Sequence, residues 1–263
     1  MTYETIKLEI QQSLAILVLN RPDRLNAVNA TMRRELLSAV ECVGANAAIR
    51  CLLITGSGKA FCVGQDLNER RRGPEESAPD LGLSLAEGYN PIIKNIKALQ
   101  IPVVCAVNGV AAGAGANLAL ACDIVVAKSS ARFIQSFSNI GLIPDCGGTW
   151  SLTHKIGHAR ATALAMTGEA IDALQAEEWG LIWKCYTDED FDKKSLGLAQ
   201  GLSKKPTQAL MATKLAINSS CQNTFSEQLD LEASLQRRCG YSNDYQEGIQ
   251  AFFEKRQPEF SGS

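Results

Sequence analysis

One acidic residue stands out by its surroundings: Asp145 lies in residues 141–149 (GLIPDCGGT). A second small-residue stretch, residues 109–117 (GVAAGAGAN), precedes it. Glycines allow a backbone to pass close to a ligand and to turn its N–H groups toward it. An acid placed just before a Gly-Gly turn can be held at the reacting carbon of that ligand. The two stretches together therefore predict polarisation of a carbonyl group combined with proton transfer.

Two backbone segments could supply the polarising N–H groups. Gly64 would let the chain turn and expose the N–H of Gln65. The second segment is the Gly/Ala stretch, where an expected strand at residues 103–107 leads into a helix whose first N–H groups stabilise negative charge. Each segment also has a purely structural interpretation, as a tight turn around Phe61 or as close helix packing by small residues.

Several other kinds of site are excluded by spacing. Residues 56–59 (GSGK) lack the spacing of a phosphate loop, and Ala60 stands where Ser or Thr is required. Leu118 occupies the place of the third glycine of a dinucleotide fingerprint. The two histidines, His154 and His158, have no third metal ligand nearby, so no metal site is expected.

Composition indicates an ordinary globular protein. The chain has 263 residues, of which 46% are hydrophobic and 21% charged, and no apolar run is long enough to span a bilayer. A net charge of -2 gives no broad attraction for nucleic acid. The N-terminus lacks a signal pattern, which predicts a cytoplasmic protein. Nine scattered cysteines without a C-x-x-C pair are interpreted as reduced core residues.

Hydrophobic periodicity predicts an α/β core followed by helices. Strands are expected at 14–20, 51–55, 103–107, 123–127 and 131–133, and helices at 31–46, 84–99 and from the Gly/Ala stretch to about 121. Residues 70–80, rich in charge and proline, are expected to form a mobile loop. Beyond about residue 190 only helices follow, at 191–202, 206–219, 224–239 and 244–255. We therefore expect a core at 1–190 and a helical region at 191–263.

Taken together, these stretches resemble the crotonase, or enoyl-CoA hydratase/isomerase, superfamily over nearly the whole chain. The resemblance begins at residues 20–27 (NRPDRLNA) and ends at 247–256 (EGIQAFFEKR). It implies a spiral of ββα units with a C-terminal helical trimerisation region, and an assembly as a homotrimer or a dimer of trimers.

The resemblance assigns the two family oxyanion donors to the backbone N–H groups of Gln65 and Ala114. These would bind the thioester oxygen of an acyl-CoA. Preorganised donors of this kind stabilise a developing oxyanion strongly, so an enolate can form without a metal or a separate cofactor. Coenzyme A is then expected only as part of the substrate.

The sequence differs from the hydratases of this family at two positions, and this difference narrows the range of reactions that we expect. Hydratases of this family use two glutamates to activate water, and the matching positions are Asn117 and Phe137. An amide is a poor base and a phenyl ring is none, so efficient hydration is not expected. Asn117, Phe137 and Tyr89 are assigned to the acyl pocket. Asp145 matches the position of a catalytic aspartate in several isomerases and in a dehalogenase of the superfamily.

The sequence leaves the sign of the Asp145 pKa shift open. Apolar neighbours, among them Ile140, Ile143 and Phe137, should raise the pKa of this carboxyl, because burial disfavours its charged form. The helix start expected after Gly147 should lower it.

The resemblance also implies contacts with CoA itself. The positions assigned to CoA binding are Arg24, Ala27, Ala60, Asp66, Leu67 and Lys255, with a neighbouring subunit as one source of Lys255. Arg24 and Lys255 could instead be solvated surface charges, the commoner fate of such residues.

The expected function is that of an acyl-CoA isomerase. Residues 62–67 (CVGQDL), 78–82 (APDLG), 89–91 (YNP) and 143–150 (IPDCGGTW) resemble the branch that expands an aromatic ring in phenylacetate degradation. That reaction converts 2-(1,2-epoxy-1,2-dihydrophenyl)acetyl-CoA to oxepin-CoA. The alternatives are a Δ3,Δ2-enoyl-CoA isomerase or an enoyl-CoA hydratase of fatty-acid oxidation, and a non-catalytic acyl-CoA-binding protein.

Overall fold

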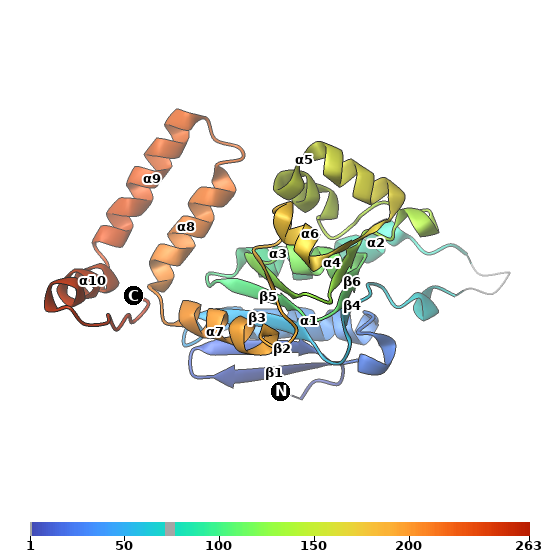
Figure 1. The fold of residues 1–263 in the computed structure, drawn as a ribbon, viewed down its shortest axis with the longest axis horizontal. Coiled ribbons are helices and arrows are strands. Elements are labelled where there is room, and N and C mark those ends of the chain that lie inside the picture. The colour runs from blue at the N-terminus through green and yellow to red at the C-terminus, as the bar shows by residue number, and fades with distance from the viewer. Residues whose placement is uncertain (1, 72–76) are drawn as a thin grey trace.

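The computed structural model describes residues 2–71 and 77–263 and contains two β-sheets (Figure 1). Of the loop expected at 70–80, residues 72–76 lie outside the described residues. The larger sheet has the strand order β1-β2-β3-β5-β7-β10, and the smaller has the order β4-β6-β8-β9. The strands are β1 (Ile6–Gln11), β2 (Leu14–Leu19), β3 (Cys51–Gly56), β4 (Ala60–Cys62), β5 (Val103–Val107), β6 (Val110–Ala112), β7 (Ile124–Lys128), β8 (Arg132–Ile134), β9 (Ala170–Asp172) and β10 (Lys184–Tyr186).

The two sheets are built by one repeated step along the chain. Strands β3, β5 and β7 of the larger sheet are each followed within a few residues by a strand of the smaller sheet, β4, β6 and β8. The neighbours within each of these triplets pair in parallel, and helices return the chain to the larger sheet. This arrangement confirms the predicted α/β class and the spiral of ββα units.

Both faces of the larger sheet are covered by helices. Strand β5 is buried along its whole length, as expected for a parallel strand packed on both sides. Phe191 and Ala199 of α7 pack with Leu53 and Val104 on one face. Helices α1 and α3 pack into the other core cluster. The helices are α1 (Ala30–Ala45), α2 (Leu81–Ser84), α3 (Asn90–Ala98), α4 (Ala114–Leu120), α5 (Gly148–Thr167), α6 (Ala173–Glu178), α7 (Phe191–Ser203), α8 (Thr207–Ser219), α9 (Phe225–Gly240) and α10 (Asn243–Glu254).

The helix expected at 84–99 is confirmed as a continuous helical run over residues 81–98. It consists of α2, a wider helical turn, η3 (Leu85–Tyr89), and α3. Pro91, which has no N–H to donate to the preceding turn, lies in the first turn of α3, just after the wider turn. Tyr89, which is 7% exposed, lies at the end of this wider turn.

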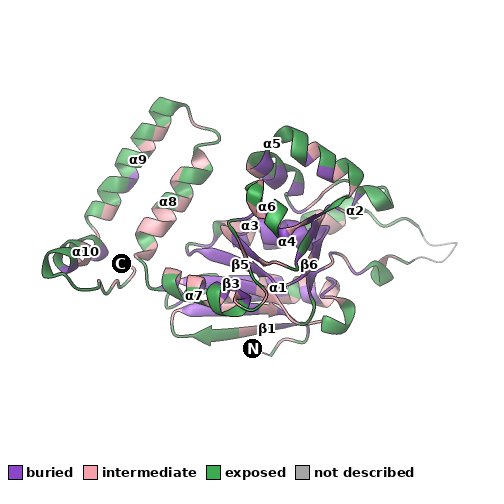
Figure 2. Cartoon of the chain, in the orientation of Figure 1, coloured by how far each residue is buried: buried purple, intermediate pink, exposed green. Residues whose placement is uncertain are grey.

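The last three helices extend away from the body of the molecule (Figure 1). Burial is concentrated in the sheets and the helices beside them, and α8–α10 are largely exposed (Figure 2). Helix α7 packs on the larger sheet, whereas α8 contains no buried residue. The domain division at residue 190 stays a prediction. Within the described residues, no helix has the length and apolar character needed to cross a membrane.

Candidate active site

The two predicted backbone donors lie on adjacent segments. Strands β4 and β6 pair in parallel, with Cys62 opposite Ala111. Just beyond them, a Cβ added to Gly64 would lie 3.0 Å from the Ala112 oxygen and 3.3 Å from the Ala114 nitrogen. Gly64 also has a φ of +88°, so both the space and the backbone conformation favour glycine. The sequence therefore brings the chain around Gln65 against the start of α4.

Hydrogen bonds hold both segments while leaving the donors free. Val28 donates its N–H to the Gly64 oxygen at 2.7 Å and accepts from the Asp66 N–H at 3.0 Å, so the bridge passes over Gln65. On the other side, the first helical bond of α4 runs from the Asn117 N–H to the Gly113 oxygen. Among the described residues, neither the Gln65 N–H nor the Ala114 N–H donates a hydrogen bond. Both remain available to a ligand oxygen.

Asp145 lies in the turn that leads into α5. Its carbonyl oxygen accepts from the Gly148 N–H at 2.8 Å. The next two residues, Cys146 and Gly147, have φ angles of +51° and +76°, a pair of left-handed conformations that reverses the chain. The carboxylate oxygen Oδ1 is buried and has no hydrogen-bond partner, and a carboxylate oxygen left unpaired in this way is typical of a group held for proton transfer.

The environment raises the pKa of Asp145. Burial is the largest cause, and hydrogen bonds from the Cys146 thiol and from the residue's own backbone N–H offset only part of it. This settles the sign that the sequence left open. Of the apolar neighbours expected to cause the burial, Phe137 is 5% exposed, but Ile140 and Ile143 are 53% and 79% exposed. A carboxylate with a raised pKa is a stronger base toward an activated C–H.

Asn117 connects the Asp145 turn to Gln135. Its Nδ2 donates to the Asp145 carbonyl oxygen at 2.9 Å, and its Oδ1 accepts from Gln135 Nε2 at 2.9 Å. The side chain is 1% exposed, and a Cβ at Gly148 would overlap it. Asn117 therefore joins α4 to the Asp145 turn through one donor hydrogen and one acceptor site of its amide.

The other residues assigned to the acyl pocket lie at the same place. A Cβ added to Gly113 would lie 3.7 Å from the Phe137 ring, which puts this ring beside the start of α4. The Tyr89 hydroxyl donates to Gln65 Oε1 at 2.8 Å. The structure thus brings Gln65, Ala114, Phe137, Asn117 and Asp145 together through direct or single-residue contacts, with Tyr89 joined to them through the Gln65 side chain.

Five of the six positions assigned to CoA binding surround one connected scaffold. Arg21 pairs with Asp66 at 3.0 Å and also donates to the Ala27 oxygen. Buried Asn26 donates to the Ala60 oxygen at 2.9 Å. Burial acts to raise the pKa of Asp66, but its hydrogen bonds with Arg21 and Asn68 outweigh it and lower this pKa. Of the remaining positions, Arg24 and Leu67 are exposed at the edge of this scaffold, and Ala27 and Ala60 are buried in it.

Lys255 lies elsewhere. It is an exposed residue that ends α10, and α10 is remote from α4 and β6 within the chain (Figure 1). A contact of Lys255 with CoA would therefore require a second subunit.

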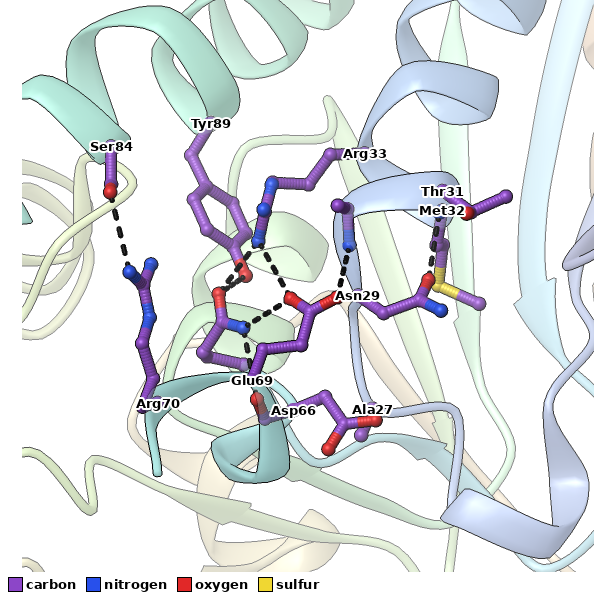
Figure 3. A network of polar contacts seen from close by, with 12 residues as sticks. Ala27, Asn29, Thr31, Met32, Arg33, Asp66, Glu69, Arg70, Ser84 and Tyr89 are labelled. Atoms are coloured by element: carbon purple, nitrogen blue, oxygen red, sulfur yellow. Dashed lines mark hydrogen bonds and ion pairs between the residues drawn. The ribbon is translucent and has the colours of Figure 1, made fainter. Parts of the chain in front are cut away.

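Sequence reasoning missed three residues that hold the site residues in place. These are Arg33, Glu69 and Gln135, with Arg33 and Glu69 drawn in Figure 3. Arg33 contacts Gln65, which lies 32 positions away in the sequence. A local sequence pattern does not indicate a contact of this range. Within the part of the chain that the structure describes, no group of three His, Cys, Asp or Glu residues could hold a metal ion.

Comparison with known proteins agrees with this geometry. A family model described as "Enoyl-CoA hydratase/isomerase" matches residues 9–263. The chain is 49% identical to the 1,2-epoxyphenylacetyl-CoA isomerase of Escherichia coli, over 98% of this chain and 99% of that protein. It is 46% identical to a Rhodobacter capsulatus protein named "Probable enoyl-CoA hydratase", over the full length of both. Among solved structures, an enoyl-CoA hydratase from Bacillus anthracis superposes with a TM-score of 0.92 at 30% identity, covering 99% of this chain and 100% of that one. Because these matches cover nearly the whole chain, the chain belongs to the enoyl-CoA hydratase/isomerase (crotonase) family and is an enzyme.

Proposed function

We propose that this enzyme isomerises an acyl-CoA thioester by proton transfer through Asp145, and that its substrate is 2-(1,2-epoxy-1,2-dihydrophenyl)acetyl-CoA. The observation that carries the proposal is the state of the acids and amides at the site. Asp145 Oδ1 is buried and unpaired, whereas the Asn117 amide is bonded at both ends. One acid beside an amide, which is a poor base, suits proton movement better than hydration.

The proposed reaction begins with the thioester oxygen between the N–H groups of Gln65 and Ala114. These donors stabilise the negative charge that forms on the oxygen when Asp145 removes a proton from the α-carbon. The electrons of the resulting enolate open the epoxide, and the six-membered ring rearranges to the seven-membered oxepin. Asp145 then returns the proton at another carbon, so the atoms balance without a cofactor.

The ring substrate rests on similarity as well as geometry. The E. coli relative named as a 1,2-epoxyphenylacetyl-CoA isomerase is 49% identical, and Phe137 supplies an aromatic wall beside the oxyanion donors. The same donors and acid would also move a double bond in a 3-enoyl-CoA. The name of the 46% identical relative keeps hydration as the outcome to test against.

One experiment separates these activities. The purified protein is offered epoxyphenylacetyl-CoA, an aliphatic 3-enoyl-CoA and crotonyl-CoA, and the rates and products are compared by chromatography and mass spectrometry. We expect the epoxide to react fastest and crotonyl-CoA to be hydrated slowest. Rapid crotonyl-CoA hydration would contradict the role given to Asn117 and Phe137, and turnover of the 3-enoyl-CoA alone would contradict the ring substrate.

The assembly proposed for this enzyme is a homotrimer or a dimer of trimers. Large apolar side chains on the extended helices support it, because Phe225, Phe252 and Phe253 are each at least 77% exposed. A groove of about 890 Å³ also runs between α8, α9 and α10. Exposed apolar surface of this extent is typical of a subunit interface. In such an assembly Lys255 of one subunit would reach the CoA of another.

A further inference from the structure

The side chain of Gln65 uses its entire hydrogen-bonding capacity. Its Oε1 accepts from the Tyr89 hydroxyl at 2.8 Å and from Arg33 Nη1 at 2.8 Å. Its Nε2 donates to the Asp66 carbonyl oxygen at 3.1 Å and to Glu69 Oε2 at 3.2 Å. A side-chain amide has two acceptor sites and two donor hydrogens, so this amide has no donor or acceptor left for another partner.

The partners come from separate elements that meet at this amide (Figure 3). Arg33 is on α1, Tyr89 ends η3, and Glu69 lies in the short helix η2 (Leu67–Arg70). The Arg33 guanidinium lies 5.4 Å from the centre of the Tyr89 ring and 3.7 Å from the Glu69 carboxylate. Glu69 also accepts from the Ala30 N–H, the first of α1, at 2.9 Å. The four residues Arg33, Gln65, Glu69 and Tyr89 are called here the Gln65 clamp.

The clamp is shielded enough to be stiff. Tyr89 is 7% exposed and the Arg33 side chain 18%. A Cβ added to Gly88 would lie 3.2 Å from Arg33 Cδ, so the arginine is packed along the η3 turn. Hydrogen bonds away from water are strong, and breaking one leaves a polar group unpaired at a cost. The clamp therefore fixes the Gln65 side chain in one direction.

We infer that Arg33 and Tyr89 are positioning residues for the oxyanion site. The Gln65 side chain and its backbone N–H leave the same Cα, so fixing the side chain restricts rotation of the peptide that carries the N–H. A donor to an oxyanion acts only at close range, and small misplacements cost large factors in rate. This inference rests on the proposed role of the Gln65 N–H and adds the residues that aim it.

A merely structural clamp would behave differently. If the clamp only held the η2 segment in place, its loss would weaken binding of every CoA ligand alike. If the clamp instead directs the Gln65 N–H at the thioester oxygen, its loss should weaken the binding of ligands that have this oxygen. The stretching frequency of the bound thioester carbonyl reports the difference, because hydrogen bonds to the oxygen shift it to lower wavenumber whatever the affinity.

The test uses phenylacetyl-CoA labelled with ¹³C at the carbonyl and its thioether analogue, which lacks the oxygen. The variants are Tyr89→Phe, Arg33→Met and Gln65→Met. Arg34→Met is the matched control, since Arg34 is an exposed neighbour on the same helix. We expect the wild type and the control to show the carbonyl shift and to bind the thioester better than the thioether. The clamp variants should show a smaller carbonyl shift. Their preference for the thioester over the thioether should fall about tenfold, and so should kcat, which is the loss typical of one hydrogen bond.

The outcomes separate the inference from the proposed function. If the wild type itself shows no carbonyl shift, the oxyanion assignment fails and the proposed function with it. If the wild type shows the shift and all three variants retain it, the positioning role is overturned and the proposed function stands. Tyr89→Phe removes a single oxygen atom, so it decides the question if Arg33→Met does not fold.

Discussion

The carboxyl group of Asp145 titrates in a partly buried position, so its protonation state affects both activity and stability. The folded protein raises the pKa of this carboxyl, mainly through burial. A group whose pKa is higher in the folded than in the unfolded state binds its proton more tightly when folded. Protonation of Asp145 therefore favours folding, and its contribution to stability falls as pH rises from the usual aspartate range through the raised pKa.

Asp145→Asn should accordingly abolish activity without loss of stability at neutral pH. We expect kcat to fall by about 10³-fold or more, as is typical when a general base is removed. The free energy of unfolding at pH 7 should be equal to or higher than that of the wild type, because a desolvated charge has been removed. Urea denaturation at pH 7 and at a pH below the usual aspartate range measures this, and any gain should vanish at the lower pH. A variant that keeps full turnover would show that the base is another residue.

Asn117→Ala should reduce both turnover and stability. The change leaves Gln135 Nε2 without its partner at 2.9 Å and removes one of the two donors to the Asp145 carbonyl oxygen, which keeps the Gly148 N–H. Unpaired buried groups of this kind cost about 1–3 kcal/mol. The Asp145 turn then loses its attachment to α4, so kcat should fall by more than KM rises. Steady-state kinetics and thermal melting check both effects, with Asn218→Ala on the exposed face of α8 as the control. An unchanged kcat would contradict the role of this contact.

At the scale of elements, the carboxylate of Asp244 holds the end of the chain against α10. It is 3% exposed and accepts from the Ser261 N–H at 2.7 Å, the Ser261 hydroxyl at 3.0 Å and the Gly262 N–H at 2.9 Å. Arg50 binds the same segment through the Phe260 carbonyl oxygen. The last residues thereby connect α10 to the region around β3.

Asp244→Ala should therefore loosen α10 before the core. Removing three acceptor contacts of a buried carboxylate should cost about 2–4 kcal/mol locally. Hydrogen exchange followed by mass spectrometry should show faster exchange in α10 and in residues 259–263, with β5 unchanged. Equal acceleration in β5 would mean that α10 and the core unfold together, against this expectation.

Several elements can be predicted from the sequence, but the two short strands beside the site, β4 and β6, are missed, as is the longer strand β1. The strands β3 and β5 and the helix α1 were predicted within a residue or two because each has a clear apolar pattern. The strands β4 and β6 have three residues each, too few for a period to show. Residues 60–67 were interpreted as a turn, and the start of the Gly/Ala stretch as the approach to a helix.

The site residues just beyond these short strands can be identified for a different reason. Gly64 marks a position where two backbones meet, and Gly113 has a positive φ angle beside the Phe137 ring. Both constraints are visible in a single sequence as a glycine. No comparable sequence feature identifies Arg33 or Gln135. Their roles depend on contacts with residues 32 and 18 positions away, which only the folded chain defines.

At the scale of the whole molecule, α8–α10 form an apolar surface that the body of the chain leaves uncovered. Phe225 is 80% exposed and Phe252 77%, while α8 has no buried residue. Transferring such rings out of water stabilises an assembly by about 1.5–3 kcal/mol for each ring. The proposed trimer would supply the missing cover.

Phe225→Ser together with Phe252→Ser should therefore weaken the assembly. We expect sedimentation analysis to show a smaller species than the wild type at the same concentration, and exposed helices that bind a hydrophobic dye. The Leu67→Ser variant, which changes an exposed apolar residue outside α8–α10, serves as the control for assembly state alone. A double variant that sediments as the wild type does would place the interface elsewhere.

The contact between Asn117 and the Asp145 turn also limits how this enzyme can evolve. A glutamate at position 117 would bring a longer, charged side chain against Gly148, where the amide already leaves no room for a Cβ. It would also replace the donor to the Asp145 carbonyl oxygen with an acceptor, and its negative charge would face that oxygen. A second acid introduced at this position alone would therefore disturb the turn that holds Asp145.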